Sequence, residues 1–177
     1  MKQFGEHLVR LLLWLLLSEV FCLVLAFSFA LLGGALPLRI AGMLCGITAH
    51  VLLMYSTAKR TAEDDLRTYR QTGNAMPRRK PLLFAVCGML PAFLLYLLLM
   101  LRRDSVLMQN LFLLLNAPMI GLYRLLFGGH EPFSAVPLLQ RLLTAFPPLL
   151  TGIALLAGYL PHYRRGIAAC HARSSRG

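Results

Sequence analysis

Long apolar blocks alternate with short polar segments along this chain. Four of the blocks reach or exceed about 20 residues, the length that an α-helix needs to cross a hydrocarbon core roughly 30 Å thick. They cover residues 8–32, 38–58, 81–101 and 137–160. A fifth apolar block, residues 105–127, is interrupted by polar and proline positions. The pattern predicts an all-α integral membrane protein in which residues 1–177 form a single membrane domain.

Composition and charge agree with this class. The 177 residues are 58% hydrophobic and 14% charged, whereas soluble domains are usually about 45–50% apolar and about 25% charged. Lys and Arg number 18 against 7 Asp and Glu, and the basic residues gather at the ends of apolar blocks. Basic residues at such places contact anionic lipid headgroups, so the expected partner is the lipid bilayer. Because no basic face with interleaved aromatic residues is found, nucleic acid is not expected as a partner.

The distribution of basic residues predicts the topology. Lys and Arg favour the cytoplasmic side, and the polar loop 59–80 contains seven of them. If the N-terminus is cytoplasmic, the basic tail 161–177 is cytoplasmic too only when 105–127 does not cross the membrane. We therefore expect four transmembrane helices plus a broken re-entrant or interfacial segment, with both termini cytoplasmic, in a plasma or inner membrane. Five spans are the alternative, and they place the basic tail outside.

The loop 59–80 contains its own helix signals. Thr61 precedes three acidic residues, which resembles a helix start, and Gly73 resembles a stop. These signals predict a short surface helix, with a solvated charged loop as the alternative. The basic run that ends the loop is expected to anchor the topology and to contact anionic headgroups; it consists of Arg78, Arg79 and Lys80.

Glu19 is the most informative single residue, because a carboxylate near the middle of a membrane is costly unless it is paired, protonated or hydrated. At about 1.5 Å per residue, Glu19 lies roughly 16 Å from the cytoplasmic end of its span, and His50 roughly 12 Å from the same surface. A contact between the two side chains is therefore expected to be within reach. It could serve as a proton or ion relay, or as a polar clasp that holds two helices together.

Small residues recur at helical spacing in two spans. Gly42 and Gly46 form a GxxxG motif that shares a face with His50, and Ala154 with Gly158 forms a second stripe. Small residues at this spacing let a neighbouring helix approach closely. The pattern predicts close packing and leaves open whether the partner is internal or a second copy.

Several positions free helix backbone at membrane depth. Such breaks line substrate or ion sites in some transporters, and elsewhere they are plain kinks satisfied by neighbouring helices. The candidate positions are Pro91, Asn116, Pro118, Pro147 and Pro148.

No arrangement typical of an enzyme is found. The chain lacks nucleophile-elbow, zinc-protease and phosphate-loop motifs, and its four cysteines show no metal-ligand spacing. We expect no catalytic residue, no cofactor and no metal.

The chain resembles a group of small, uncharacterised bacterial membrane proteins. The shared features are a charged central loop, the pair Gly88 and Pro91 in the following span, and a last span ending in Gly158-Tyr159. The resemblance implies no activity, because none is known for that group.

Two functional hypotheses follow. The first is a non-enzymatic assembly or accessory component that packs through its small-residue faces, with itself or in a larger membrane complex. The alternative is a small channel or proton-coupled carrier that uses Glu19 and His50.

Overall fold

The computed structural model describes residues 2–31, 36–73, 79–127 and 133–174, and all regular structure in these ranges is helical. The elements in chain order are α1 (Lys2–Leu31), α2 (Leu36–Thr72), α3 (Lys80–Leu101), α4 (Val106–Leu114), the short 3-10 helix η1 (Ala117–Met119), α5 (Ile120–Phe127), α6 (Leu138–Leu143) and α7 (Phe146–Ser174).

Four helical stretches are long and apolar enough to cross a membrane, as the sequence predicts. They are Phe4–Leu31, Leu36–Thr72, Lys80–Leu101 and Leu138–Cys170. The predicted broken segment is also present, because α4 and the stretch Ala117–Tyr123 meet at an angle of 96°. The chain is therefore a multi-pass helical membrane protein with four spanning helices and one bent helix pair.

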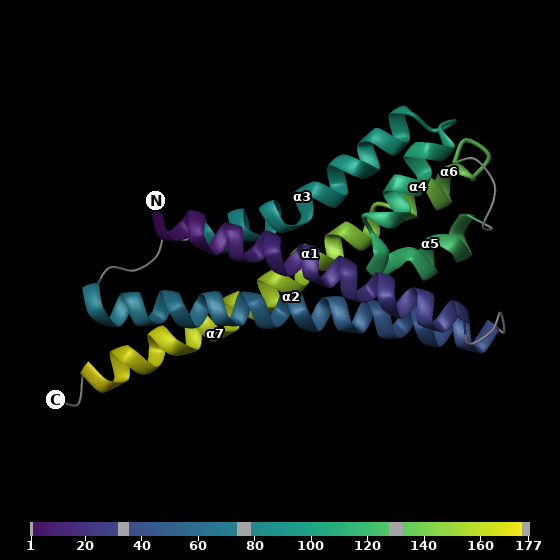
Figure 1. Ribbon diagram of the computed structural model, residues 1–177. Coiled ribbons are helices and arrows are strands. Elements are labelled where there is room, and N and C mark those ends of the chain that lie inside the picture. The colour runs from purple at the N-terminus through teal and green to yellow at the C-terminus, as the bar shows by residue number, and fades with distance from the viewer. Residues whose placement is uncertain (1, 32–35, 74–78, 128–132, 175–177) are drawn as a thin grey trace.

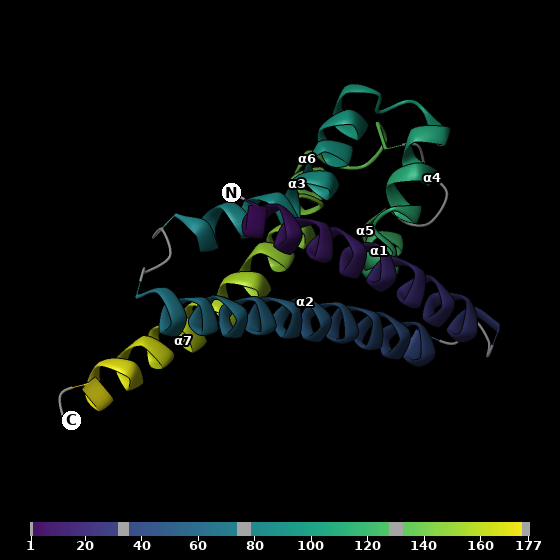
Figure 2. The ribbon, with the colours of Figure 1, turned by 60° about the vertical axis from the view of Figure 1, so that its left-hand side comes forward.

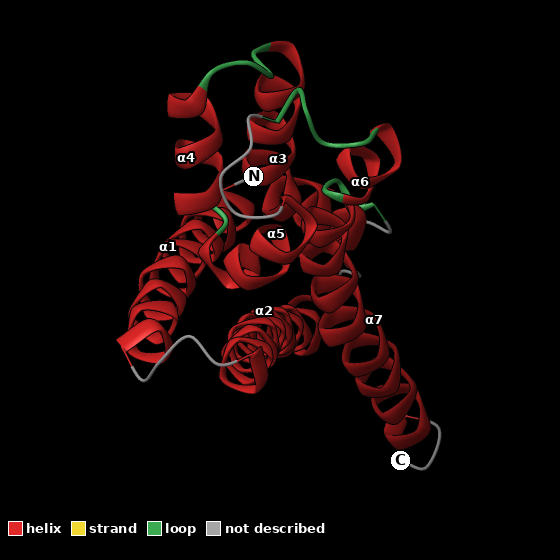
Figure 3. Ribbon diagram, turned by 90° about the vertical axis from the view of Figure 1, so that its right-hand side faces the viewer, coloured by secondary structure: helices red, strands yellow, loops and turns green. Residues whose placement is uncertain are grey.

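The four long helices form a bundle in which α2 packs against α1 and α7, and α3 packs chiefly against α7. In Figure 1, α1 and α2 run side by side, and α7 crosses against both α2 and α3. The bent pair packs beside α1, and Figure 2 shows α4 and α5 as its two arms. Viewed from the end in Figure 3, α5 lies over α2 between α1 and α7. The first residues of α1 and the last residues of α7 lie toward the same end of the bundle (Figure 1).

Helix α2 continues well past the span expected at 38–58. The stretch 59–72 is an extension of α2 and is neither a separate surface helix nor a solvated loop. The reason is local, because no Gly or Pro occurs between residues 47 and 72 to end the helix. The helix ends where the stop is predicted: Gly73 has φ 70°, and its N–H bonds the Tyr69 carbonyl at 2.8 Å.

The expected helix breaks at proline differ in outcome, because Pro147 and Pro148 follow the break between α6 and α7 whereas Pro91 lies inside α3. Pro147 and Pro148 lie in the first turn of α7, where proline is tolerated because the first N–H groups have no partner within the helix. Helix α3 continues past Pro91 without interruption. Helix α7 also extends to Ser174, so most of the basic tail is helical. In the described ranges, one break lies at Asn116 and Pro118, between α4 and α5, and another lies at residues 144–145, directly before Pro147 and Pro148, between α6 and α7.

Two clusters of buried side chains hold the bundle together. The first joins all four long helices, and its members on α3 are Phe84 and Ala85. The second surrounds the bent pair, and its members on α3 are Tyr96 and Leu99. The α3 residues between these two positions face the cavity that is described next.

Candidate functional site

A cavity of about 230 Å³ lies between the two apolar clusters. Its wall on α3 is formed by Gly88, Pro91, Ala92 and Leu95, which fall between the α3 members of the two clusters. Pro91 is near the middle of Lys80–Leu101, so the cavity lies at mid-membrane depth. Side chains from α1, α2, η1, α7 and the connection between α4 and η1 complete its lining.

Glu19 holds the bent helix pair against α1. Its carboxylate oxygen Oε2 accepts a hydrogen bond from the backbone N–H of Ala117 at 2.8 Å. Ala117 opens η1, directly after the chain bends at Asn116. The first N–H groups of a helix lack partners inside the helix and attract negative charge. Glu19 therefore caps a helix that begins within the membrane.

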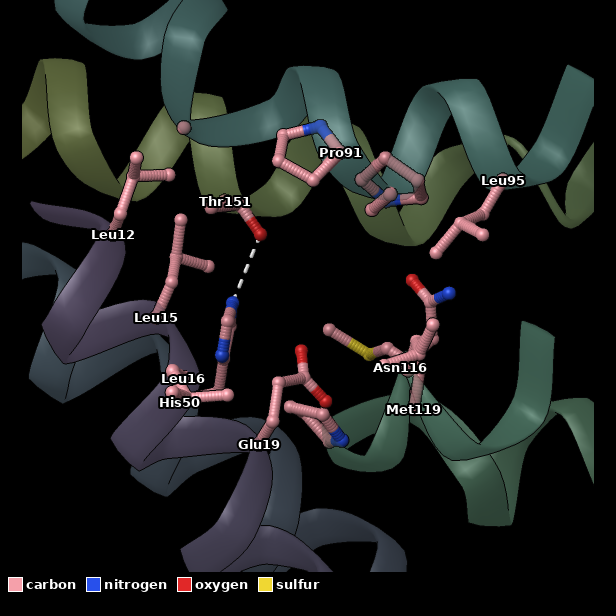
Figure 4. Close-up of a pocket in the computed structure, with 15 residues that line it drawn as sticks. Leu12, Leu15, Leu16, Glu19, His50, Pro91, Leu95, Asn116, Met119 and Thr151 are labelled. Carbon is pink, nitrogen blue, oxygen red and sulfur yellow. Dashed lines mark hydrogen bonds between the residues drawn. The ribbon is translucent and has the colours of Figure 1, made fainter. Parts of the chain in front are cut away.

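His50 links three spanning helices. Its ring nitrogen Nδ1 is 2.9 Å from Ser18 Oγ on α1, and Nε2 is 2.9 Å from Thr151 Oγ1 on α7. All three side chains are buried. Figure 4 shows the bond between His50 and Thr151 at the back of the cavity. His50 thus fixes the spacing of α1, α2 and α7 at the level of the site.

Glu19 and His50 do not form the expected hydrogen bond with each other. Both residues line the cavity, yet each bonds to other groups. The physical reason is the position of the broken segment. It brings a free backbone N–H to Glu19, while Ser18 and Thr151 satisfy the imidazole. The two residues are joined only through Ser18, the chain neighbour of Glu19.

Asn116 completes the polar part of the lining. Its side-chain nitrogen Nδ2 donates to the Phe112 carbonyl at 2.9 Å, and the residue is buried. Figure 4 shows the Asn116 and Glu19 side chains directed into the same space from opposite sides. The remaining acceptor atoms, Glu19 Oε1 and Asn116 Oδ1, have no hydrogen-bond partner in the described part of the chain.

The small residues of α2 pack against this chain's own elements. A Cβ on Gly42 would come within 2.8 Å of the Phe29 ring on α1, and one on Gly46 would lie 3.2 Å from the Pro118 carbonyl oxygen. The bent pair can reach the cavity because Gly46 leaves room for its backbone. The Gly42 and Gly46 face is therefore covered within the monomer.

The second small stripe joins α7 to α2. A Cβ on Gly158 would collide with the Tyr55 carbonyl oxygen on α2, and Ala154 is buried in the first apolar cluster. The small residues of α7 therefore allow α7 and α2 to approach closely.

A second polar group, which the sequence does not predict, lies where the first turns of α1 and α3 pack against α2 and α7. We call it the terminal polar cluster; it consists of His7, Asp65, Lys80 and Tyr159. Lys80 Nζ is 2.6 Å from Asp65 Oδ1, and the Tyr159 hydroxyl donates to Asp65 Oδ2 at 2.5 Å. Lys80 Nζ also lies 3.2 Å from His7 Nδ1. One residue comes from each of the four long helices.

The terminal polar cluster corrects the expected role of Lys80. Its side chain is 6% exposed and paired with the fully buried Asp65, so it does not contact lipid headgroups. Arg79 is exposed, and Arg78 lies outside the described residues. The helical extension of α2 explains the difference, because it carries Asp65 back onto the start of α3. An apolar neighbourhood such as Ala58, Ala62 and Leu66 is the signal that marks this face as buried.

No metal site accompanies these groups. Across the described ranges, no three His, Cys, Asp or Glu side chains come together in a way that could hold an ion.

Comparisons with known protein families, with curated proteins and with solved structures find no match to this chain.

Proposed function

We propose that this chain is a non-enzymatic carrier that binds a small ligand in the cavity at Glu19 and His50. The observation that carries the proposal is a mid-membrane cavity of about 230 Å³ with an acidic side chain in its wall. A clasp between two helices needs only a dry contact, whereas a transport site needs space at the level of the carboxylate. The broken helix pair beside Glu19 adds support, because half-helix ends at mid-membrane form the sites of many transporters.

Assembly through the Gly42 and Gly46 face receives less support. Phe29 and Pro118 of the same chain cover this face, so a second copy or a larger complex would have to use another surface. Self-association through some other lipid-facing surface stays a prediction.

We also propose that both termini are cytoplasmic, in a plasma or inner membrane. Basic side chains at the end of the bundle where both termini lie are exposed, among them Arg67, Arg70, Arg79 and Arg164. Their excess there fits the preference of Lys and Arg for the cytoplasm, and Arg79 is placed to meet anionic lipids. Labelling of a cysteine introduced at Ser175 tests the orientation, and a tail labelled only from outside contradicts it.

The carrier proposal is tested in liposomes that contain the purified protein. Uptake is measured for three probes, namely protons, methylammonium and dodecylamine, because a cavity with an acidic wall favours cations and hydrogen-bond donors. We expect at least one probe to move faster than in empty liposomes. Glu19→Gln should abolish the increase, and the control Glu6→Gln, which alters an exposed carboxylate on the same helix, should retain it. No protein-dependent uptake of any of the three contradicts the proposal.

A further inference from the structure

The cavity wall is buried on one side and exposed on the other. The lining residues contributed by α2, η1 and α7 are inside the bundle, and His50 and Thr151 are 3% and 5% exposed. The lining residues on α1 and directly after α4 include Leu12, Leu16 and Leu115, which are 43%, 60% and 45% exposed. The cavity therefore opens sideways, toward the surface that α1, α3 and α4 share.

That surface faces hydrocarbon. Leu12 and Leu16 lie within the spanning stretch Phe4–Leu31, and the exposed Pro91 lies near the middle of α3. Leucine side chains at the opening of the cavity are apolar, so they pack favourably against lipid tails and unfavourably against water. A ligand that enters here comes from the bilayer and not from the aqueous phase.

The size of the cavity limits what it can hold. Pockets that enclose a whole drug-sized ligand usually measure roughly 300–1,000 Å³, and this one is smaller, at about 230 Å³. It has room for a polar head group, while an attached chain would extend through the apolar mouth into the surrounding lipid.

The chemistry of the lining selects the head group. The unpaired oxygens of the lining, Glu19 Oε1 and Asn116 Oδ1, are acceptors, beside one remaining N–H of Asn116 Nδ2, and both ring nitrogens of His50 are occupied. No Lys or Arg is among the described residues that line the cavity. A phosphate or carboxylate head would meet a carboxylate without a compensating cation, which is unfavourable in a medium of low dielectric constant. A donating head group, above all an ammonium, would form charge-assisted hydrogen bonds.

We propose that the cavity binds the hydrogen-bond-donating head group of a membrane-dissolved amphiphile, with the alkyl chain leaving between α1 and the α3–α4 side. This inference rests on the proposed function and narrows its ligand to an amphiphile that arrives from the lipid. Ammonium and hydroxyl heads share the required chemistry. The anionic headgroups of ordinary acidic lipids are excluded from the cavity.

Thermal unfolding in lipid nanodiscs tests the inference, because a ligand that binds only the folded state raises the unfolding temperature. The probes are dodecylamine, dodecanol, dodecanoate and methylammonium. We expect dodecylamine to stabilise the protein most, dodecanol less, and dodecanoate and methylammonium not at all. Glu19→Gln should weaken the apparent affinity for dodecylamine at least tenfold.

Two variants at the mouth test the path of the chain without touching a polar group. Leu16→Trp narrows the opening and should weaken dodecylamine binding at least tenfold. Its matched control is Leu17→Trp, since Leu17 is similarly exposed on α1 and does not line the cavity; it should bind like the wild type.

The outcomes separate the inference from the function on which it rests. Stabilisation by methylammonium that Glu19→Gln removes and Leu16→Trp leaves intact would overturn the amphiphile while supporting a ligand site at Glu19. Equal stabilisation by dodecylamine in the wild type, Leu16→Trp and Glu19→Gln would overturn the inference, because it would mark general partitioning. Stabilisation by none of the probes would overturn both proposals.

Discussion

The Glu19 carboxylate on α1 accepts a hydrogen bond of 2.8 Å from the backbone N–H of Ala117, 98 positions further along the chain. This contact ties the first spanning helix to the first turn after the break in the bent pair. It also leaves the second carboxylate oxygen free to face the cavity. Glu19 therefore both positions the bent helix pair and presents a carboxylate oxygen to the cavity.

The capping contact predicts the effect of changing Glu19. Loss of a side chain that caps a helix costs about 0.5–2 kcal/mol, so Glu19→Ala should lower the free energy of unfolding by about 1 kcal/mol or more. Glu19→Gln keeps an oxygen acceptor for Ala117 and should cost less. Unfolding in mixed micelles measures both values. The exposed-site control Glu6→Ala should leave stability unchanged, and equal losses at Glu6 and Glu19 would contradict the capping role.

The terminal polar cluster predicts strong coupling between Asp65 and Lys80. Removing one partner of a buried ion pair leaves an uncompensated charge and costs about 3–5 kcal/mol. Asp65→Asn and Lys80→Met should each be strongly destabilising, and the double variant should be less so than the sum of the two. A double-mutant cycle on the free energy of unfolding measures this coupling.

The matched control for this cycle is the exposed pair Lys59 and Glu63, whose charged atoms are 4.0 Å apart on α2. Exposed pairs contribute about 0–1 kcal/mol. If the cycle on Asp65 and Lys80 gives a coupling no larger than that of this pair, the terminal polar cluster does not hold the four long helices together.

The close packing at Gly158 predicts that a larger side chain at this position lowers the stability of the protein. Gly158→Ala places a methyl group against the Tyr55 carbonyl on α2, and overpacking of this kind typically costs about 1–3 kcal/mol. Gly5→Ala is the comparison, because a Cβ at Gly5 meets no other atom within 4 Å. That change should be neutral or stabilising by about 0.5–1 kcal/mol, since Ala favours helix over Gly. A Gly158→Ala variant as stable as Gly5→Ala would show that α2 and α7 are further apart.

Thr151 predicts how His50 is held. Thr151→Val keeps the shape of the side chain and removes the bond to Nε2, so stability should fall by about 1–2 kcal/mol because a buried polar atom loses its partner. The control Thr48→Val alters an exposed threonine on α2 and should be neutral. Chemical unfolding of the two variants measures the free energy of unfolding. Similar free energies for Thr151→Val and Thr48→Val would contradict a stabilising bond between Thr151 and His50.

The four spanning helices could be predicted from the sequence, because each of them contains a contiguous apolar block. Asn116 and Pro118 also marked the true break, since proline removes a backbone donor wherever it falls. Pro147 and Pro148 lie directly after the turn that separates α6 from α7, in the first turn of α7, where proline is favourable. A proline pair in the sequence indicates that a helix boundary is near, but it does not show at which residue the following helix begins.

The polar contacts were much less accessible. Glu19 was identified as important from its cost in the membrane, yet its partner is a backbone N–H that no side-chain pattern records. The sequence places Asp65 in a surface helix or a charged loop and Lys80 in a basic run at the lipid headgroups, whereas tertiary packing buries both side chains. Their pairing depends on α2 continuing past the apolar block, and on Tyr159, which lies 94 positions from Asp65.

The central claim, that the cavity at Glu19 is a ligand site open to the bilayer, is tested most directly by photolabelling. A dodecylamine analogue carrying a diazirine on its chain is activated in membranes that contain the protein, and the labelled residues are mapped by mass spectrometry. We predict labels at cavity-lining positions such as Leu15, Leu95 and Met119, competed by unlabelled dodecylamine and lost in Glu19→Gln. Labels confined to lipid-facing positions such as Leu13 and Leu17, without competition and unchanged in Glu19→Gln, would contradict the claim.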